Sequence, residues 1–139
     1  MLFRSLRDEV QADLPLEEKT LIIGNGDIVS LADARTKIKE TGCDGVMIGR
    51  GIFGTPWFFD AKAKAKSPEE RLKIMLEHAI LFEKKFGGKK RLKNFAVMKK
   101  HFKAYVSGWE GAKELRVKLM EAEDLKGVRR IVREHLHVL

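Results

Sequence analysis

The sequence is poor in cysteine and in long apolar runs. Its 139 residues include one cysteine, Cys43, which excludes an internal disulfide framework and fits a reducing compartment. No apolar stretch approaches the ~20 residues that span a bilayer, and the N-terminus lacks the order of a secretory signal. We therefore expect a cytoplasmic protein without a membrane segment. The chain is also too short for a complete TIM barrel, which needs about 250 residues.

Positive charge is concentrated in the C-terminal part of the chain. The formal net charge is +8, and Lys and Arg balance Asp and Glu over residues 1–86, with 14 of each. Over residues 87–139 the count is 14 against 6. Such an asymmetry suggests a polyanionic partner, most simply nucleic acid. A solubilising surface explains the charge equally well.

The first half of the chain carries a strand, helix, strand pattern. Two continuous apolar runs, at 20–24 and 45–48, are typical of parallel strands covered on both faces. Between them, Ser30 with Asp33 resembles a capping box, and Gly42 ends the helical stripe. The pattern predicts one βαβ unit. With no further strands beside it, the unit would leave a sheet edge and an apolar face uncovered.

Helical signals surround this unit and dominate the second half. We predict a short amphipathic helix over 2–12, where the chain looks cut, and a helical segment from Pro56. The Ala/Lys tract 60–66 is the best domain boundary, and the next helix begins with Ser67 as N-cap, Pro68 and Glu70. Apolar stripes with helical spacing then predict an antiparallel bundle over 67–139, with later helices at 112–122 and 125–137. The buried positions expected in its first two helices are Leu72, Met75, Leu76, Ala79, Phe82, Phe86, Leu92, Phe95, Met98, Phe102 and Val106.

A glycine turn follows each predicted strand: the first glycine turn is residues 24–27 and the second is residues 49–51. Ligands of parallel βα folds bind at the carboxyl ends of the strands, and glycine lets main-chain N–H groups approach an anion closely. Arg50 adds charge and a hydrogen-bonding fork. The pair predicts the phosphate-binding end of a TIM-type barrel, with residues 52–59 as its short extra helix. Turns without a ligand, capped by Asn25 and Asp27, are the alternative.

Two stretches resemble a known family. The string IIGNGDIVSLADARTKIKETGCDGVMIGRGIFGTPWFF resembles the end of the barrel in tRNA-dihydrouridine synthases, and AVMKKHFKAYVSGWEGAKELR resembles the helical domain of the same family. The resemblance implies an α/β plus all-α fold. A partial TIM barrel, its last two parallel strands with helices in residues 1–60, precedes a helical tRNA-binding bundle in residues 67–139. It also implies that FMN phosphate is bound by Asn25, Gly26 and Asp27 in one loop and by Gly49 and Arg50 in the next.

The family reaction is implied in the same way. FMN reduced by NADPH, or by NAD(P)H more generally, passes hydride to a uracil ring of tRNA, and a cysteine protonates the other carbon. That cysteine lies on an earlier barrel loop with no counterpart here, so no catalytic residue is assigned. Cys43, just before the second strand, is expected to be a small buried thiol. The chain is expected to be inactive alone and to need the N-terminal barrel segment as a partner.

A basic cluster in the predicted bundle is the expected tRNA contact. Its proposed RNA-binding residues are Arg91, Lys93, Lys99, Lys100, Lys103 and Arg116. Tyr105 and Trp109 are interpreted as core aromatics rather than base-stacking residues. The four histidines lack the spacing of a metal site. Two other functions stay open: a stand-alone basic RNA-binding helical module with a vestigial βα unit, and an unrelated barrel enzyme that keeps the phosphate site.

Overall fold

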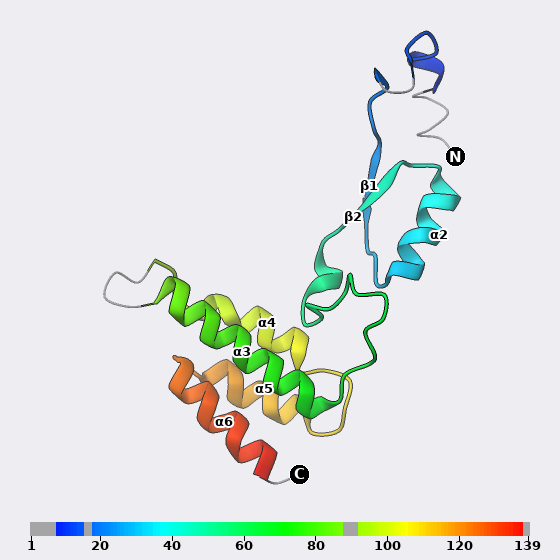
Figure 1. Cartoon of the computed structure of the whole chain (residues 1–139). Helices are drawn as coiled ribbons and strands as arrows, with labels where there is room; N and C mark the ends of the chain where they lie inside the picture. The colour runs from blue at the N-terminus through cyan, green and yellow to red at the C-terminus, as the bar shows by residue number, and fades with distance from the viewer. Residues whose placement is uncertain (1–7, 16–17, 88–91, 138–139) are drawn as a thin grey trace. The chain divides into compact units, whose positions relative to one another are not determined.

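The computed structural model describes residues 8–15, 18–87 and 92–137. The chain divides into two compact units, Met1–Ala63 and Lys64–Leu139, each with its own internal contacts (Figure 1). No helix among the described residues is long and apolar enough to cross a membrane. Most of the helix expected over 2–12 lies outside the described residues, and its described end is helical at residues 8–10.

The first unit contains the predicted βαβ arrangement. It consists of β1 (Ile23–Gly26), α2 (Leu31–Thr41) and β2 (Gly45–Ile48). The two strands pair in parallel, with Ile23 opposite Gly45 and Gly26 opposite Ile48. The prediction for β2 is confirmed, whereas β1 begins three residues later than residue 20.

The late start of β1 has a local cause in the side chains around it. The backbone N–H of Ile22 donates to Asp44 Oδ2 at 2.8 Å, so a side chain takes the place of a neighbouring strand. The side-chain amide of Gln11 bonds both the backbone N–H and the hydroxyl of Thr20. The carbonyl of Ile22 also accepts the backbone N–H of Asp44 at 2.9 Å, so both backbone and side-chain bonds hold this segment before the ladder begins at Ile23.

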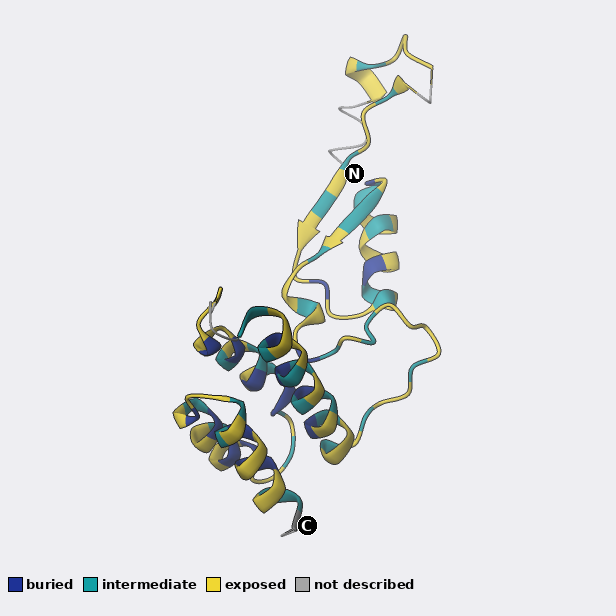
Figure 2. Ribbon diagram, turned by 60° about the vertical axis from the view of Figure 1, so that its left-hand side comes forward, coloured by how far each residue is buried: buried dark blue, intermediate teal, exposed yellow. Residues whose placement is uncertain are grey.

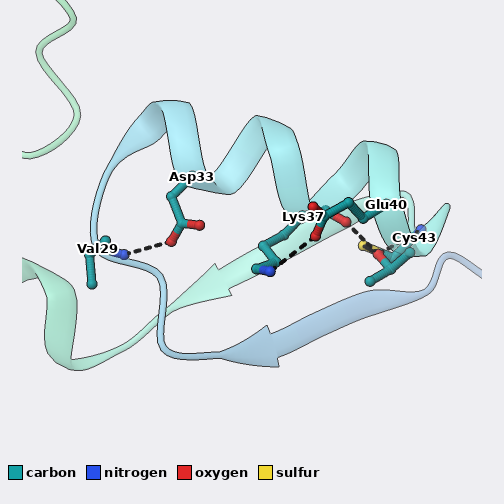
Figure 3. A network of polar contacts seen from close by, with 6 residues as sticks. Val29, Asp33, Lys37, Glu40 and Cys43 are labelled. Atoms are coloured by element: carbon teal, nitrogen blue, oxygen red, sulfur yellow. Dashed lines mark hydrogen bonds and ion pairs between the residues drawn. The ribbon is translucent and has the colours of Figure 1, made fainter.

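The caps of α2 agree with the sequence signals. Ser30 Oγ accepts the backbone N–H of Asp33 at 3.0 Å. Asp33 Oδ2 accepts the backbone N–H of Val29 at 3.0 Å (Figure 3). The second bond differs from a standard capping box, because the carboxylate bonds the residue before the N-cap. At the other end Gly42 is left-handed, with φ of 67°, and its N–H donates to the carbonyl of Ile38.

One face of the small sheet is exposed. Leu21, Ile23 and Met47 are 69%, 56% and 51% exposed, and we call these three residues the bare sheet face. The residues that alternate with them, such as Val46, are more buried. Full cover on both faces is therefore wrong for the described residues, and the expected uncovered apolar face is confirmed.

The second unit is a helical bundle, as predicted. Successive helices run in opposite directions, and each packs against the next, with the last helix returning to the first (Figure 1). Ser67 and Glu70 form a complete capping box at the start of the first helix. The elements of this unit are α3 (Pro68–Phe86), the 3₁₀ turn η3 (Phe95–Met98), α4 (Lys99–Tyr105), α5 (Ala112–Glu121) and α6 (Leu125–His137).

The main hydrophobic core lies in the second unit, where the buried residues gather on the inner sides of the helices (Figure 2). Phe95 and Phe102 are its largest fully buried side chains. The predicted stripes are confirmed except at Leu92, which is 73% exposed because it precedes η3 instead of lying within a helix. The core consists of Leu72, Met75, Ala79, Phe82, Phe95, Met98, Phe102, Tyr105, Val106, Ala112, Leu115, Leu119, Ala122, Val128, Ile131 and Val132.

Candidate functional site

The first glycine turn lies partly within β1. Asn25 and Gly26 are the last two residues of the strand and pair with Met47 and Ile48, so they are not the loop that the sequence predicted. Asp27 is the first residue after the strand, and the N–H of Ile28 returns to the carbonyl of Gly26 at 3.0 Å. The ladder begins at Ile23, three residues later than predicted. Asn25, Gly26 and Asp27 therefore lie at the end of β1, where ligands of parallel sheets bind.

The second glycine turn leads from β2 into a 3₁₀ turn, η2 (Arg50–Ile52). The first residues of such a turn have no acceptor for their N–H groups within it. At Gly51 an added Cβ would lie 2.2 Å from the carbonyl oxygen of Ile28. Only glycine allows this close approach, which brings the backbone of the second glycine turn against Ile28, the residue that follows the first glycine turn.

An ion pair joins the two glycine turns. Arg50 Nη2 lies 2.5 Å from Asp27 Oδ1, although the two residues are 23 positions apart. Both side chains remain exposed, at 81% and 78%. The structure thus brings together the cation and the end of β1 that the sequence assigned to one phosphate site.

The ends of the strands fit a phosphate group. A Cβ added at Gly26 or Gly49 would meet no atom within 4 Å, so backbone rather than side chain faces open space there. The guanidinium of Arg50 has donors beyond the one that bonds Asp27. The chemistry of this donor set suits the phosphate of FMN.

The short extra helix expected over 52–59 is wrong. After η2 the chain forms separate hydrogen-bonded turns, such as Thr55 N–H to Ile52 O at 3.1 Å and Phe58 N–H to Thr55 O at 2.9 Å. Gly54 is left-handed, with φ of 77°, which interrupts helical continuation. Pro56 also disfavours a helical conformation for the residue before it. The helical segment predicted from Pro56 is also wrong, because residues 56–59 form hydrogen-bonded turns, with the N–H of Asp60 bonded to the carbonyl of Trp57 at 2.9 Å.

The proposed RNA-binding residues differ in how far their side chains are exposed and bonded. Lys93, Lys100 and Lys103 are exposed, Lys99 is half-buried, and Arg91 lies outside the described residues. Part of the Arg116 guanidinium is already bonded within the protein, because its Nη1 donates to the carbonyl of Val106 at 2.8 Å.

A groove between α4 and α5 brings Lys103 and Arg116 together with Lys113, a lysine that sequence reasoning missed. Lys103 comes from α4, and Lys113 and Arg116 come from α5. Val117 and Met120 supply apolar lining. Lys113 precedes Arg116 by three residues, so helical spacing alone predicts that they share a face. The groove combines three cations from two helices with one carboxylate, Glu121.

The aromatic residues considered for base stacking are occupied within the bundle. Tyr105 is 2% exposed, which confirms it as a core aromatic. Trp109 packs against the core, and the guanidinium of Arg71 lies 5.1 Å from its ring centroid. Arg71 also donates to the carbonyls of Ala104 and Ser107, at 3.1 and 2.8 Å. It therefore fixes the end of α4 and the loop that follows.

Two histidines from different helices meet in the bundle. The rings of His78 and His101 are 4.8 Å apart in an edge-to-face arrangement, and His78 Nδ1 lies 3.4 Å from the hydroxyl of Tyr105. Burial lowers the pKa of both imidazoles, and for His101 the neighbouring His78 and Lys100 add to this decrease in pKa. No spacing in the sequence signals this contact, because it depends on how α3 and α4 pack.

The one cysteine is buried where the sequence indicates. Cys43 is 5% exposed and lies just before β2, at the opposite end of the strand from the second glycine turn. The hydroxyl of Thr41 lies 3.1 Å from its sulfur (Figure 3). Among the described residues, no three His, Cys, Asp or Glu side chains are grouped so that they could hold a metal ion.

Comparison with known proteins places this chain beside one enzyme family. A family model described as dihydrouridine synthase matches residues 8–138. "Probable tRNA-dihydrouridine synthase" of Staphylococcus epidermidis strain RP62A is 35% identical over 129 residues, which are 93% of this chain and 37% of that protein. The protein of the same name from Staphylococcus aureus strain Mu50 is 34% identical over 131 residues, with 94% and 38% covered. "Probable tRNA-dihydrouridine synthase 2" of Bacillus subtilis strain 168 is 33% identical over 129 residues, with 93% and 37% covered. The chain spans a little over a third of the length of these relatives.

Proposed function

The chain belongs to the dihydrouridine synthase family, and from this premise we propose that it binds FMN phosphate through its first unit and tRNA through its second. The activity proposed for the complete enzyme is the NAD(P)H-dependent reduction of tRNA uridine to dihydrouridine. The observation that carries the first half is that the two glycine turns meet at the carboxyl ends of two parallel strands, where Arg50 of the second turn pairs with Asp27 of the first.

In the proposed flavin site, the backbone and the side chains have different roles. Gly26 and Gly49 leave room for an anion beside the backbone, and Arg50 supplies positive charge and hydrogen-bond donors. Asn25 adds a side-chain amide at the end of β1. A bound flavin would supply the hydride for uracil reduction. The described residues bind and orient its phosphate.

Cys43 is not the proton donor in this proposal. It is 5% exposed and lies at the end of β2 away from the glycine turns, whereas the chemistry of βα barrels takes place at the carboxyl ends of strands. The proton donor and the remaining flavin contacts would come from further barrel strands. We therefore propose that this 139-residue chain, purified alone, does not form dihydrouridine. Measured NADPH-dependent dihydrouridine formation would contradict this.

The phosphate proposal is tested by comparing FMN with riboflavin, which lacks the phosphate. The Arg50→Ala variant should weaken FMN binding about 10- to 100-fold, the equivalent of a lost charge-assisted hydrogen bond. Riboflavin binding should not change. Arg35→Ala, which removes an exposed arginine from α2, is the matched control. Equal losses of both ligands, or equal effects of the two arginines, would count against the site.

The groove between α4 and α5 supports the proposed tRNA contact. Lys103, Lys113 and Arg116 present positive charge there, and phosphate neutralisation releases counterions from RNA. Combining Lys103→Ala and Lys113→Ala should weaken tRNA binding and reduce the salt slope by about 1 per lost phosphate contact. Lys39→Ala on α2 is the control for charge alone. If the control weakens binding as much, the contact is a general charge effect.

A stand-alone RNA-binding bundle is the second candidate, favoured by the complete core of the second unit. It predicts salt-sensitive tRNA binding by a chain that does not distinguish FMN from riboflavin. The comparison of FMN with riboflavin therefore decides between the candidates, because both predict tRNA binding.

A further inference from the structure

Asp27 has a role that differs from direct phosphate binding. At neutral pH a carboxylate is an acceptor with a negative charge, so it offers no donor to a phosphate and repels it. In the structure its Oδ1 instead bonds Arg50 Nη2 at 2.5 Å. The residue that lies in the phosphate-binding sequence motif is therefore in contact with the cation of the neighbouring turn.

The pair leaves Arg50 available to a ligand. A guanidinium has five N–H donors in a fixed fork, and one bond to Asp27 leaves the others for an anion. The Arg50 side chain is 81% exposed, so no described part of the protein covers it. Without a partner, an exposed arginine would lose much side-chain freedom on binding an anion. The bond to Asp27 restricts that freedom before the ligand arrives.

The backbones beneath the pair are also held together. Gly51 approaches the carbonyl of Ile28 so closely that an added Cβ would lie 2.2 Å from it. The N–H of Val29 is bonded to Asp33, which ties the chain after Asp27 to the start of α2. The two ends of the ion pair thus rise from a supported backbone rather than from independent loops.

We propose that Asp27 is a positioning residue: its carboxylate orients the Arg50 guanidinium toward the phosphate monoester of FMN and does not itself contact the phosphate. This inference rests on the proposed flavin function. It assigns different roles to two neighbouring residues of one sequence motif, because Gly26 faces the anion with its backbone and Asp27 acts only through Arg50.

The experiment measures FMN and riboflavin binding to the full 139-residue chain by NMR titration, which detects weak binding. Asp27→Ala should weaken FMN binding about 3- to 10-fold, with riboflavin unchanged. Asp27→Asn keeps an acceptor for Arg50 and should stay within about 2-fold of the natural chain. In an Arg50→Ala background, Asp27→Ala should have no further effect, because its action requires the guanidinium.

Two further measurements separate positioning from general effects. Glu40→Ala removes the same charge from another ion pair of the first unit, Lys37–Glu40 at 3.0 Å, and should leave FMN binding unchanged (Figure 3). The NMR signal of the Arg50 Nε–H should show faster side-chain motion in Asp27→Ala before any ligand is added.

The outcomes distinguish failure of the positioning role of Asp27 from failure of the proposed phosphate site. Tighter FMN binding by Asp27→Ala would show that the carboxylate competes with phosphate, and it would overturn the positioning role. Unchanged FMN binding by Asp27→Ala, with loss in Arg50→Ala, would overturn it while keeping the phosphate site. A natural chain that binds FMN no better than riboflavin would overturn both.

Discussion

The two units of this chain differ in how many apolar side chains they bury. The second unit encloses a core of sixteen residues contributed by all its helices. The buried apolar residues described in the first unit are Ile28, Ala34 and Cys43, while Leu21, Ile23 and Met47 remain exposed. Since apolar burial is the main favourable term in folding, the second unit has what independent stability requires and the first does not. Further barrel strands beside the first unit would therefore add more to its stability than to that of the second unit.

The sharpest test of this contrast is a cavity in the core of the second unit. Phe102 is fully buried, with its ring centroid 6.1 Å from that of Phe95. Phe102→Ala should lower the free energy of unfolding by about 3–5 kcal/mol, because it removes apolar contact and leaves a cavity. Denaturant unfolding followed by helical circular dichroism measures this. A loss below about 1 kcal/mol would mean that the bundle is not tightly packed in solution.

The next test uses helix caps that occur in both units. Ser67 Oγ accepts the N–H of Glu70 at 3.2 Å, and Ser30 Oγ accepts the N–H of Asp33 at 3.0 Å. Ser67→Ala should cost about 1 kcal/mol of the unfolding free energy of the bundle. The same change at Ser30 should instead reduce the population of folded α2, because the first unit has little stability to lose. NMR signals of the two helices report each effect, and equal behaviour would remove the contrast.

The sequence predicted most of the helical bundle, and the reason is local. The signals at Ser67, Pro68 and Glu70 act within one turn of helix, and the apolar stripe of α3 has a period set by helix geometry. The prediction that Leu92 is buried was wrong, because periodicity does not show where a helix begins after a loop. The contact between His78 and His101 was beyond such reasoning, since it depends on the packing of two helices.

The placement of the glycine turns at the strand ends was predicted from the sequence, whereas their conformation was not. The glycine turns at the strand ends follow from general rules for parallel βα folds. The position of Asn25 inside β1 did not, because the extent of the ladder depends on contacts between residues far apart in the chain, such as Ile22 with Asp44. The ion pair between Asp27 and Arg50 also required three-dimensional information, since it joins residues 23 positions apart.

A smaller effect should come from pH, and it should separate the two units because residues 1–63 contain no histidine. Burial lowers the pKa of folded His78 and His101 below the ordinary value of 6.5, so the unfolded chain binds more protons as the pH falls through 6.5. The bundle should therefore be most stable above this pH and lose stability between 6.5 and the lower folded pKa values. Replacing both histidines with Gln should flatten the profile measured by denaturant unfolding at several pH values. A profile that keeps its slope would assign the effect to other groups.

The smallest effect is expected on the bare sheet face, where a matched pair of methionines makes the comparison direct. Met47 is 51% exposed and Met98 is fully buried, so Met98→Ala should cost about 2–5 kcal/mol while Met47→Ala stays within about 0.5 kcal/mol. Cys43, the only cysteine of the chain, gives an independent probe of the first unit, because its 5% exposed thiol reacts with a labelling reagent only when this unit opens. Met47→Ala should leave that labelling rate unchanged. A large increase would mean that another molecule, such as a second copy of the chain, covers Met47 in solution. The first unit would then bury its apolar face against that molecule, and the two units would differ less in burial than the isolated chain indicates.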